Sequence, residues 1–167
     1  MAVSAMSFFE QLMGFSETTG PEIRAQLTLD GSTLTSMVNG SSYEAGRLTI
    51  PALRDLRRTG LPTTGRSTVR EVVADVQALH LLPENAGAFF QVASQFNLLE
   101  MDKPNRTPEE GVGIYQHDRT QGPACAIACG AATIYRNWLV PVDGQPGQTE
   151  QRQIDCIADL GEAFGGG

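Results

Sequence analysis

The densest group of side chains that could do chemistry is the run His-Asp-Arg-Thr-Gln over residues 117–121, which Gly122 and Pro123 follow. All five can donate, accept or carry charge, and a segment of small apolar residues that favours a helix begins directly after them. A helix N-terminus presents unpaired backbone N–H groups and the positive end of the helix dipole. The run is therefore suited to bind a phosphate, a pyrophosphate or a developing oxyanion.

Helix capping is the alternative interpretation of the same run. Asp118 or Thr120 could cap the helix while Gln121 bonds back to the cap, and Arg119 could pair with a carboxylate. Capping uses one or two of these side chains, whereas the run contains five. Both interpretations stay open at this point.

A second polar group lies inside the otherwise apolar segment from Phe89 to Leu99. It consists of Gln91, Ser94, Gln95 and Asn97, and burying such groups without partners costs roughly 1–3 kcal/mol each. They could face outward from a half-exposed strand, or they could end a strand whose C-terminal edge opens onto a ligand.

Three segments, taken in order, resemble the poly(ADP-ribose) glycohydrolase branch of the macrodomain fold. They are the segment Val92 to Asn97, the loop Gly111 to Gly113 and the helix start at Gln121. That family uses a strand ending in Asn, a glycine-rich loop and a Gln-Glu-Glu motif at a helix start. The resemblance implies that Asn97 meets the distal ribose, that the glycine loop faces the ligand, and that Gln121 matches the Gln of the motif. Gly122 and Pro123 stand where the family has its glutamates.

The resemblance implies binding of ADP-ribose or a related nucleotide diphosphate, with hydrolysis of ADP-ribosyl linkages as a further expectation. The candidate catalytic residues are Gln121, from the motif, and Asp118, because cleavage of a glycosidic bond needs a carboxyl group as acid or water activator. An ADP-ribosylated protein is then a possible partner, and no cofactor is needed. A binding module without catalysis is the alternative that the missing glutamates favour. The ligand contacts expected from these patterns come from Gln95, Asn97, Gly111, Gly113, Arg119, Thr120 and Gly122.

A different class of enzyme comes from Gln121 and Cys125, which resemble the papain-like cysteine hydrolases. In that family a Gln supports the oxyanion and a helix dipole lowers the pKa of the Cys. His80 and His117 are the two histidines available as a base. A Cys among Ala and Ile is also typical of a packed core thiol that resists alkylation. Cys125 and Cys129, four residues apart, could share a metal, but two further ligands are not evident, so no metal is expected.

An α/β fold must position these residues, and we expect a macrodomain-like mixed sheet with flanking helices. Residues 1–59 are expected to form a helix over Met6 to Met13 and an antiparallel meander. Its turns fall at the dipeptides Asp30-Gly31 and Asn39-Gly40. The segment Gly60 to Ser67 is the expected joint between this part and the rest.

Residues 68–167 are expected to form the α/β region. Strands are predicted over Val69 to Val76 and Phe89 to Asn97, a long helix over Ala124 to Trp138, and a last helix over Gln151 to Leu160. Glycines follow Leu160, and no second glycine-rich pyrophosphate loop is seen. The region could therefore be incomplete, and we expect the chain to be marginally stable.

Bulk composition limits the partners. The 167 residues are 41% hydrophobic, which allows one core, and the net charge of -7 opposes binding of nucleic acid through bulk charge. No apolar run is long enough for a signal peptide or a membrane span. Three cysteines without paired CxxC spacing are typical of a reducing compartment. A soluble, cytoplasmic protein without membrane contact is the expectation.

Overall fold

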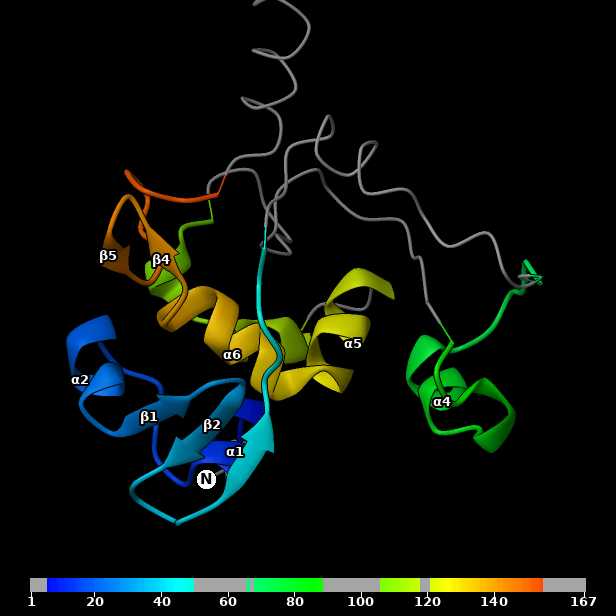
Figure 1. Ribbon diagram of the computed structural model, residues 1–167, viewed down its shortest axis with the longest axis horizontal. Helices are drawn as coiled ribbons and strands as arrows, with labels where there is room; N and C mark the ends of the chain where they lie inside the picture. Colours follow the sequence, from blue (N-terminus) through cyan, green and yellow to red (C-terminus); the bar gives the residue numbers. More distant parts are fainter. Residues whose placement is uncertain (1–5, 50–65, 67, 89–105, 118–120, 155–167) are drawn as a thin grey trace, which may run out of the picture.

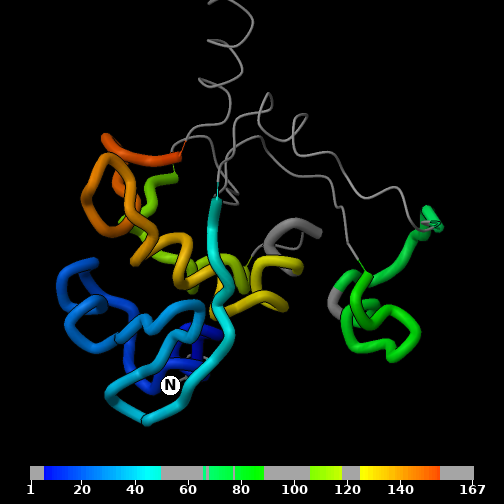
Figure 2. Tube along the Cα trace, viewed as in Figure 1, coloured from blue at the N-terminus to red at the C-terminus, as the bar shows by residue number. Residues whose placement is uncertain are grey.

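The computed structural model describes residues 6–49, 66, 68–88, 106–117 and 121–154. Figures 1 and 2 trace these elements from blue at the N-terminus to red at the C-terminus. In chain order they are α1 (Phe8–Met13), α2 (Gly20–Arg24), β1 (Leu27–Asp30), β2 (Thr33–Ser36), β3 (Ser42–Glu44), α4 (Val76–His80), η1 (Pro83–Asn85), η2 (Pro108–Glu110), η3 (Gly113–His117), α5 (Gln121–Ala128), α6 (Gly130–Trp138), β4 (Pro141–Val142) and β5 (Gln145–Pro146).

The first helix, α1, confirms the prediction over Met6 to Met13. Ser7 and Glu10 form a capping box in which each side chain accepts a backbone N–H of the other residue. Gly14 ends the helix with φ of 77°, a left-handed conformation that suits glycine. The aromatic face of α1 turns into the core, because Phe8 and Phe9 are both buried.

The antiparallel meander is also confirmed. β2 lies between β1 and β3, with Leu27 opposite Ser36 and Leu34 opposite Tyr43. Gly31 supplies a positive φ of 61° in the short loop between the first two strands. Buried Ser36 donates its hydroxyl to the carbonyl of Met13 at 2.6 Å, so the sheet is joined to the end of α1.

The long helix expected over Ala124 to Trp138 is wrong, because the structure has two helices, α5 and α6, that meet at Cys129. A continuous helix would bond the N–H of Gly130 to the carbonyl of Ala126. Instead the hydroxyl of Thr133 donates to that carbonyl at 2.6 Å. The Thr133 hydroxyl thus occupies the Ala126 carbonyl at the position where the two helices meet.

One hydrophobic core joins elements from both sides of the expected joint at residues 60–67. α6 places its apolar face against α1, α2 and β3, as its spacing of 3 and 4 residues dictates. The boundary between residues 1–59 and 68–167 stays a prediction, but the two parts share this core. Its buried members include Phe9, Met13, Ile23, Leu27, Leu34, Val112, Tyr115, Ile134, Trp138, Val140 and Ile154.

The strand expected over Val69 to Val76 is wrong. Residues 68–73 have no regular structure, Val69 and Val73 are almost fully exposed, and Val76 begins the short helix α4. Asp75 accepts the N–H of Ala78 and so caps that helix. β-branched residues favour a strand only where a neighbouring strand and a core receive them.

The C-terminal part of the described chain is held on α6. Val142 pairs with Gln145 in the β4 and β5 hairpin. The side chain of Gln148 donates to the carbonyl of Arg136 and accepts the N–H of Ile154. Gln151 lies in a turn closed by the bridge between Thr149 and Arg152, and residues 153–154 have no regular structure, so the expected helix does not begin at Gln151; the rest of that helix lies outside the described residues.

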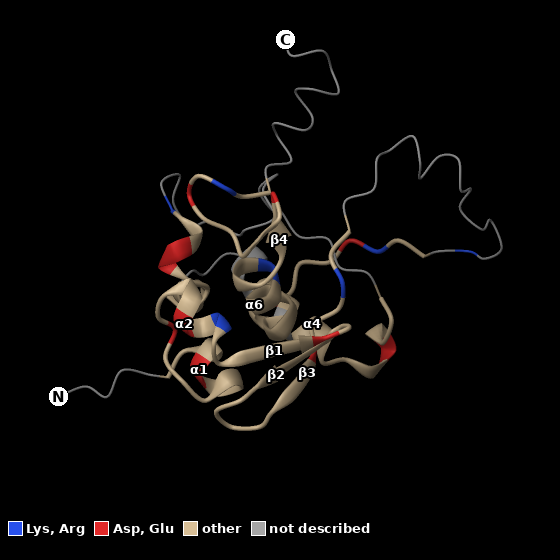
Figure 3. Cartoon of the chain, turned by 60° about the vertical axis from the view of Figure 1, so that its left-hand side comes forward, with Lys and Arg blue, Asp and Glu red and all other residues tan. Residues whose placement is uncertain are grey.

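The α/β composition is confirmed at this coarse level, and the paired strands of the described residues are antiparallel. Among the residues that the structure describes, Figure 3 shows basic positions interspersed with acidic ones. The described helices are each too short or too polar to cross a membrane.

Candidate functional site

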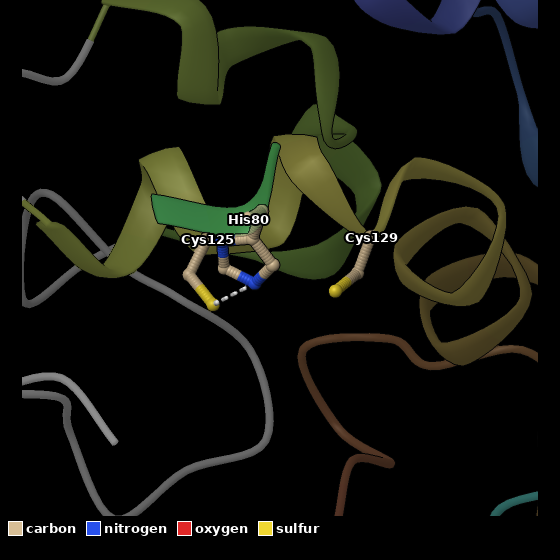
Figure 4. A group of neighbouring side chains, drawn as sticks. All are labelled: His80, Cys125 and Cys129. Atoms are coloured by element: carbon tan, nitrogen blue, oxygen red, sulfur yellow. Dashed lines mark hydrogen bonds between the residues drawn. The ribbon is translucent and has the colours of Figure 1, made fainter. Parts of the chain in front are cut away.

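Three side chains that can bind metals or move protons meet where α4 lies against α5. They are His80 at the end of α4, Cys125 in α5 and Cys129 at the junction with α6 (Figure 4). One ligand atom from each lies within 4.8 Å of the others. The Sγ of Cys125 is 3.9 Å from the Nε2 of His80, which is within hydrogen-bonding range for sulfur.

The backbone of α4 fixes the tautomer of His80. Its Nδ1 is 2.7 Å from the carbonyl oxygen of Val76, one helical turn earlier. A carbonyl oxygen can only accept, so Nδ1 carries the hydrogen and donates it. In the neutral ring Nε2 is then the acceptor, and it is this atom that faces Cys125. His80 therefore presents a lone pair to the thiol.

The helical spacing of Cys125 and Cys129 places both thiols near the same imidazole. Residues four apart lie on one face of a helix, and the N–H of Cys129 donates to the carbonyl of Cys125 at 3.1 Å. Cys125 is partly exposed and Cys129 is exposed. Cys125 is therefore not fully buried in the core, and its expected resistance to alkylation stays a prediction.

The other histidine considered as a base, His117, is exposed at the end of η3. Its ring lies 3.4 Å from the side-chain amide of Gln116. The structure thus selects His80 as the partner of Cys125.

α5 begins at Gln121, the last residue of the polar run and three residues before the helix start expected at Ala124. Asp118, Arg119 and Thr120 lie outside the described residues, and so do the side chains of residues 121–124. Gln95 and Asn97 also lie outside them. Their roles in binding or catalysis, and those of Gln121 and Gly122, stay predictions.

The glycine loop has an internal partner that the sequence did not reveal. The carboxylate of Glu17 accepts the backbone N–H groups of Val112 and Gly113 at 2.9 and 2.7 Å, and the indole N–H of Trp138 at 2.6 Å. Gly111 has φ of 84°, and a Cβ there would lie 2.5 Å from the Glu17 carboxylate. The glycine therefore gives this carboxylate room to approach the loop.

Burial raises the pKa of the Glu17 carboxyl above its ordinary value. The three N–H donors act in the opposite direction, and the negative charge of Glu10 adds a small further increase. Gly111 and Gly113 were predicted to face a ligand, and in the structure their loop binds a protein carboxylate. Ligand contact at these two glycines stays a prediction.

The described site therefore combines a thiol, a second thiol one helical turn away, and an imidazole whose acceptor nitrogen faces them. Such a group can transfer a proton from sulfur to nitrogen, or it can hold a soft metal ion. The sequence pattern marks Cys125, Cys129 and His80 as separate candidates but does not show that they meet. Comparison with known proteins gives no match to a family model, to a curated protein or to a solved structure.

Proposed function

We propose that the chain is a thiol-dependent hydrolase in which Cys125 is the nucleophile and His80 is the general base. One observation carries the proposal: the Nε2 acceptor of His80 lies 3.9 Å from the sulfur of Cys125, while Nδ1 is held by the carbonyl of Val76. This is the arrangement that activates a nucleophile, with a base beside it and a third group that orients the base. Separations of this length shorten when substrate binds.

The chemistry follows from the positions of the two groups. Nε2 of His80 takes the proton of the thiol as sulfur attacks a carbonyl carbon, and the imidazolium returns this proton to the leaving group. Water then attacks the thioester and regenerates the thiol. Backbone N–H groups in the first turn of α5 have no partner within the helix, so they can support the oxyanion. The substrate class is an ester, amide or thioester.

The rate of alkylation at each cysteine tests this proposal. Exposure alone favours reaction at Cys129, which is exposed, over Cys125, which is partly buried. Activation by His80 reverses this order, so iodoacetamide should label Cys125 faster than Cys129 in the reduced, metal-free protein. His80→Gln should abolish the preference, whereas His117→Gln should keep it. Faster labelling of Cys129 in the wild type would contradict the proposal.

Turnover of an activated ester gives a second readout. Wild-type protein should hydrolyse p-nitrophenyl acetate with an initial burst, because the acyl-enzyme accumulates. Cys125→Ala should remove the burst, and Cys129→Ala should retain it. Equal bursts in the wild type and in Cys125→Ala would mean that another group reacts with the ester.

Nucleotide binding is the second candidate function, and the start of α5 at Gln121 is the observation that favours it. We infer that an ADP-ribose-type ligand binds at this helix start in a macrodomain-like arrangement, with Asn97 on the ribose. Asp118 would be the acid or base of any hydrolysis, and Arg119 would weaken that role if it paired with Asp118. The helix N-terminus suits the pyrophosphate by charge.

Calorimetry with ADP-ribose tests the nucleotide candidate separately from the thiol. Asn97→Ala should weaken binding by roughly 1–3 kcal/mol, since a hydrogen-bonded group loses its partner. Asp118→Ala should abolish hydrolysis of an ADP-ribosylated peptide and leave affinity for ADP-ribose nearly unchanged. Cys125→Ala should affect neither quantity. Lack of ADP-ribose binding by the folded chain would leave helix capping as the role of the polar run.

Free thiols also bear on the compartment. The hydrolase needs Cys125 as a reduced thiol, and the cytoplasm keeps thiols reduced. We infer a cytoplasmic location on this ground.

A further inference from the structure

We propose that His80, Cys125 and Cys129 form a binding site for a soft metal ion, with Zn²⁺ as the ion that fits best. The site goes beyond the hydrolase and does not depend on it, because it rests on the placement of three side chains. It also adds a role for Cys129, which the hydrolase does not use.

The separation of the three ligand atoms agrees with a tetrahedral ion. Zn–S and Zn–N bonds of about 2.3 and 2.0–2.1 Å require ligand atoms about 3.6 to 3.8 Å apart. The Sγ of Cys125 and the Nε2 of His80 are 3.9 Å apart, and the three atoms all lie within 4.8 Å. The ligand atoms therefore need to move by about 1 Å or less to reach the separations of a tetrahedral Zn²⁺ site.

The orientation of His80 supports the same inference. Metal-binding histidines usually donate the hydrogen of the second ring nitrogen to a carboxylate, a carbonyl or a water, which fixes the tautomer. The Nδ1 of His80 does so with the carbonyl of Val76 at 2.7 Å. Nε2 is the remaining ring nitrogen that can act as the ligand atom, and Figure 4 shows the ring lying between the sulfur atoms of Cys125 and Cys129.

The ligand types select the kind of ion. Two thiolates and one imidazole favour Zn²⁺ or Cu⁺ over Mg²⁺ or Ca²⁺, which prefer oxygen ligands. Three protein ligands leave the fourth position of a tetrahedral Zn²⁺ for water or another group. An ion at this position would occupy the sulfur of Cys125 and the lone pair of His80. Metal binding and nucleophilic attack by Cys125 would therefore exclude each other.

Zinc titration of the reduced, full-length chain tests the site. We expect one Zn²⁺ per chain in competition with a chromophoric chelator, and a thiolate-to-metal charge-transfer band when Co²⁺ replaces Zn²⁺. His80→Gln, Cys125→Ser and Cys129→Ser should each weaken Zn²⁺ binding by at least about tenfold. His117→Gln is the matched control, because this exposed histidine is not in the cluster, and it should bind Zn²⁺ as the wild type does.

A protection experiment covers variants that fail to fold. One equivalent of Zn²⁺ should slow iodoacetamide labelling of Cys125 and of Cys129 together in the wild-type protein. Absence of stoichiometric Zn²⁺ binding, or equal weakening by His80→Gln and His117→Gln, would overturn the proposal. Because labelling of the metal-free protein tests the hydrolase, the two proposals can fail independently.

Discussion

Glu17 is predicted to stabilise the fold more than any exposed carboxylate, because it joins three segments that are distant in sequence. Its carboxylate accepts N–H groups from Val112, Gly113 and Trp138. Glu17→Ala leaves all three donors without this acceptor. Val112 and Trp138 are buried, whereas Gly113 and Glu17 are only partly buried. At about 1 kcal/mol for each of the two buried donors and less for Gly113, the loss in free energy of unfolding is about 2–3 kcal/mol.

Glu17→Gln is the finer perturbation, since it keeps the shape of the side chain. Its amide oxygen can still accept from Val112 and Trp138, but its NH₂ group then faces the N–H of Gly113, donor to donor. One unpaired donor in this partly buried position costs about 1 kcal/mol, and removal of the partly buried charge offsets part of this loss. We therefore expect Glu17→Gln to be destabilising by less than Glu17→Ala.

Urea unfolding followed by circular dichroism measures these differences through the midpoint at constant slope. Glu44→Gln is the matched control, because this carboxylate is exposed and, within the described residues, accepts the N–H of Gly46 two residues away. The control should lie within about 0.5 kcal/mol of the wild type. If Glu17→Ala cost no more than the control, the three hydrogen bonds would not stabilise the fold and the reasoning would be refuted.

Three further predictions concern backbone space, a buried hydroxyl and pH. Gly147→Ala should cost at least about 2 kcal/mol more than Gly144→Ala in urea unfolding. Both glycines have positive φ, but a Cβ at Gly147 would lie 2.7 Å from a backbone carbonyl of α6, whereas Gly144 has open space. Ser36→Ala should cost about 1–2 kcal/mol and Ser42→Ala less than about 0.5, because only Ser36 is buried; equal costs would contradict this. The raised pKa of Glu17 means that the folded chain holds this proton more tightly than the unfolded chain. Urea midpoints measured against pH should therefore show that the wild type loses stability relative to Glu17→Gln as pH rises above about 4.5 and through the raised pKa. A gain in relative stability over this range would mean that the pKa of Glu17 is lowered on folding.

Local patterns predicted the N-terminal part of the fold. The helical spacing before Gly14 gave α1, and alternation with glycine turns at Gly31 and Gly40 gave the meander. These features depend on residues close in sequence, where periodicity and turn chemistry act directly.

Tertiary context overrode local preference elsewhere. The β-branched residues from Val69 to Val73 satisfy a strand pattern, yet the structure gives them neither a paired strand nor a buried face. The break at Cys129 accompanies a hydroxyl bond from Thr133, which composition does not reveal. The run of small residues therefore predicted a single long helix where the structure has two shorter helices.

The candidate site could be predicted only as separate residues. His80 and Cys125 are 45 residues apart, and their contact depends on how α4 packs on α5. No spacing rule relates two such positions. Glu17 was missed for the same reason, since its partners begin 95 residues later and its neighbours in sequence give no signal of burial.

The contacts of Glu17 also order events during synthesis on the ribosome. Its hydrogen bonds cannot form until their donors, which lie 95, 96 and 121 residues downstream, have been synthesised. The meander can form from its own hairpins as soon as it emerges, but the face that meets α6 must remain uncovered until Trp138 has been translated. Long-range closure of this kind slows folding relative to local contacts. Until α6 is complete, the nascent chain lacks the contacts of α6 on this apolar face, and transiently exposed surface of this kind favours aggregation.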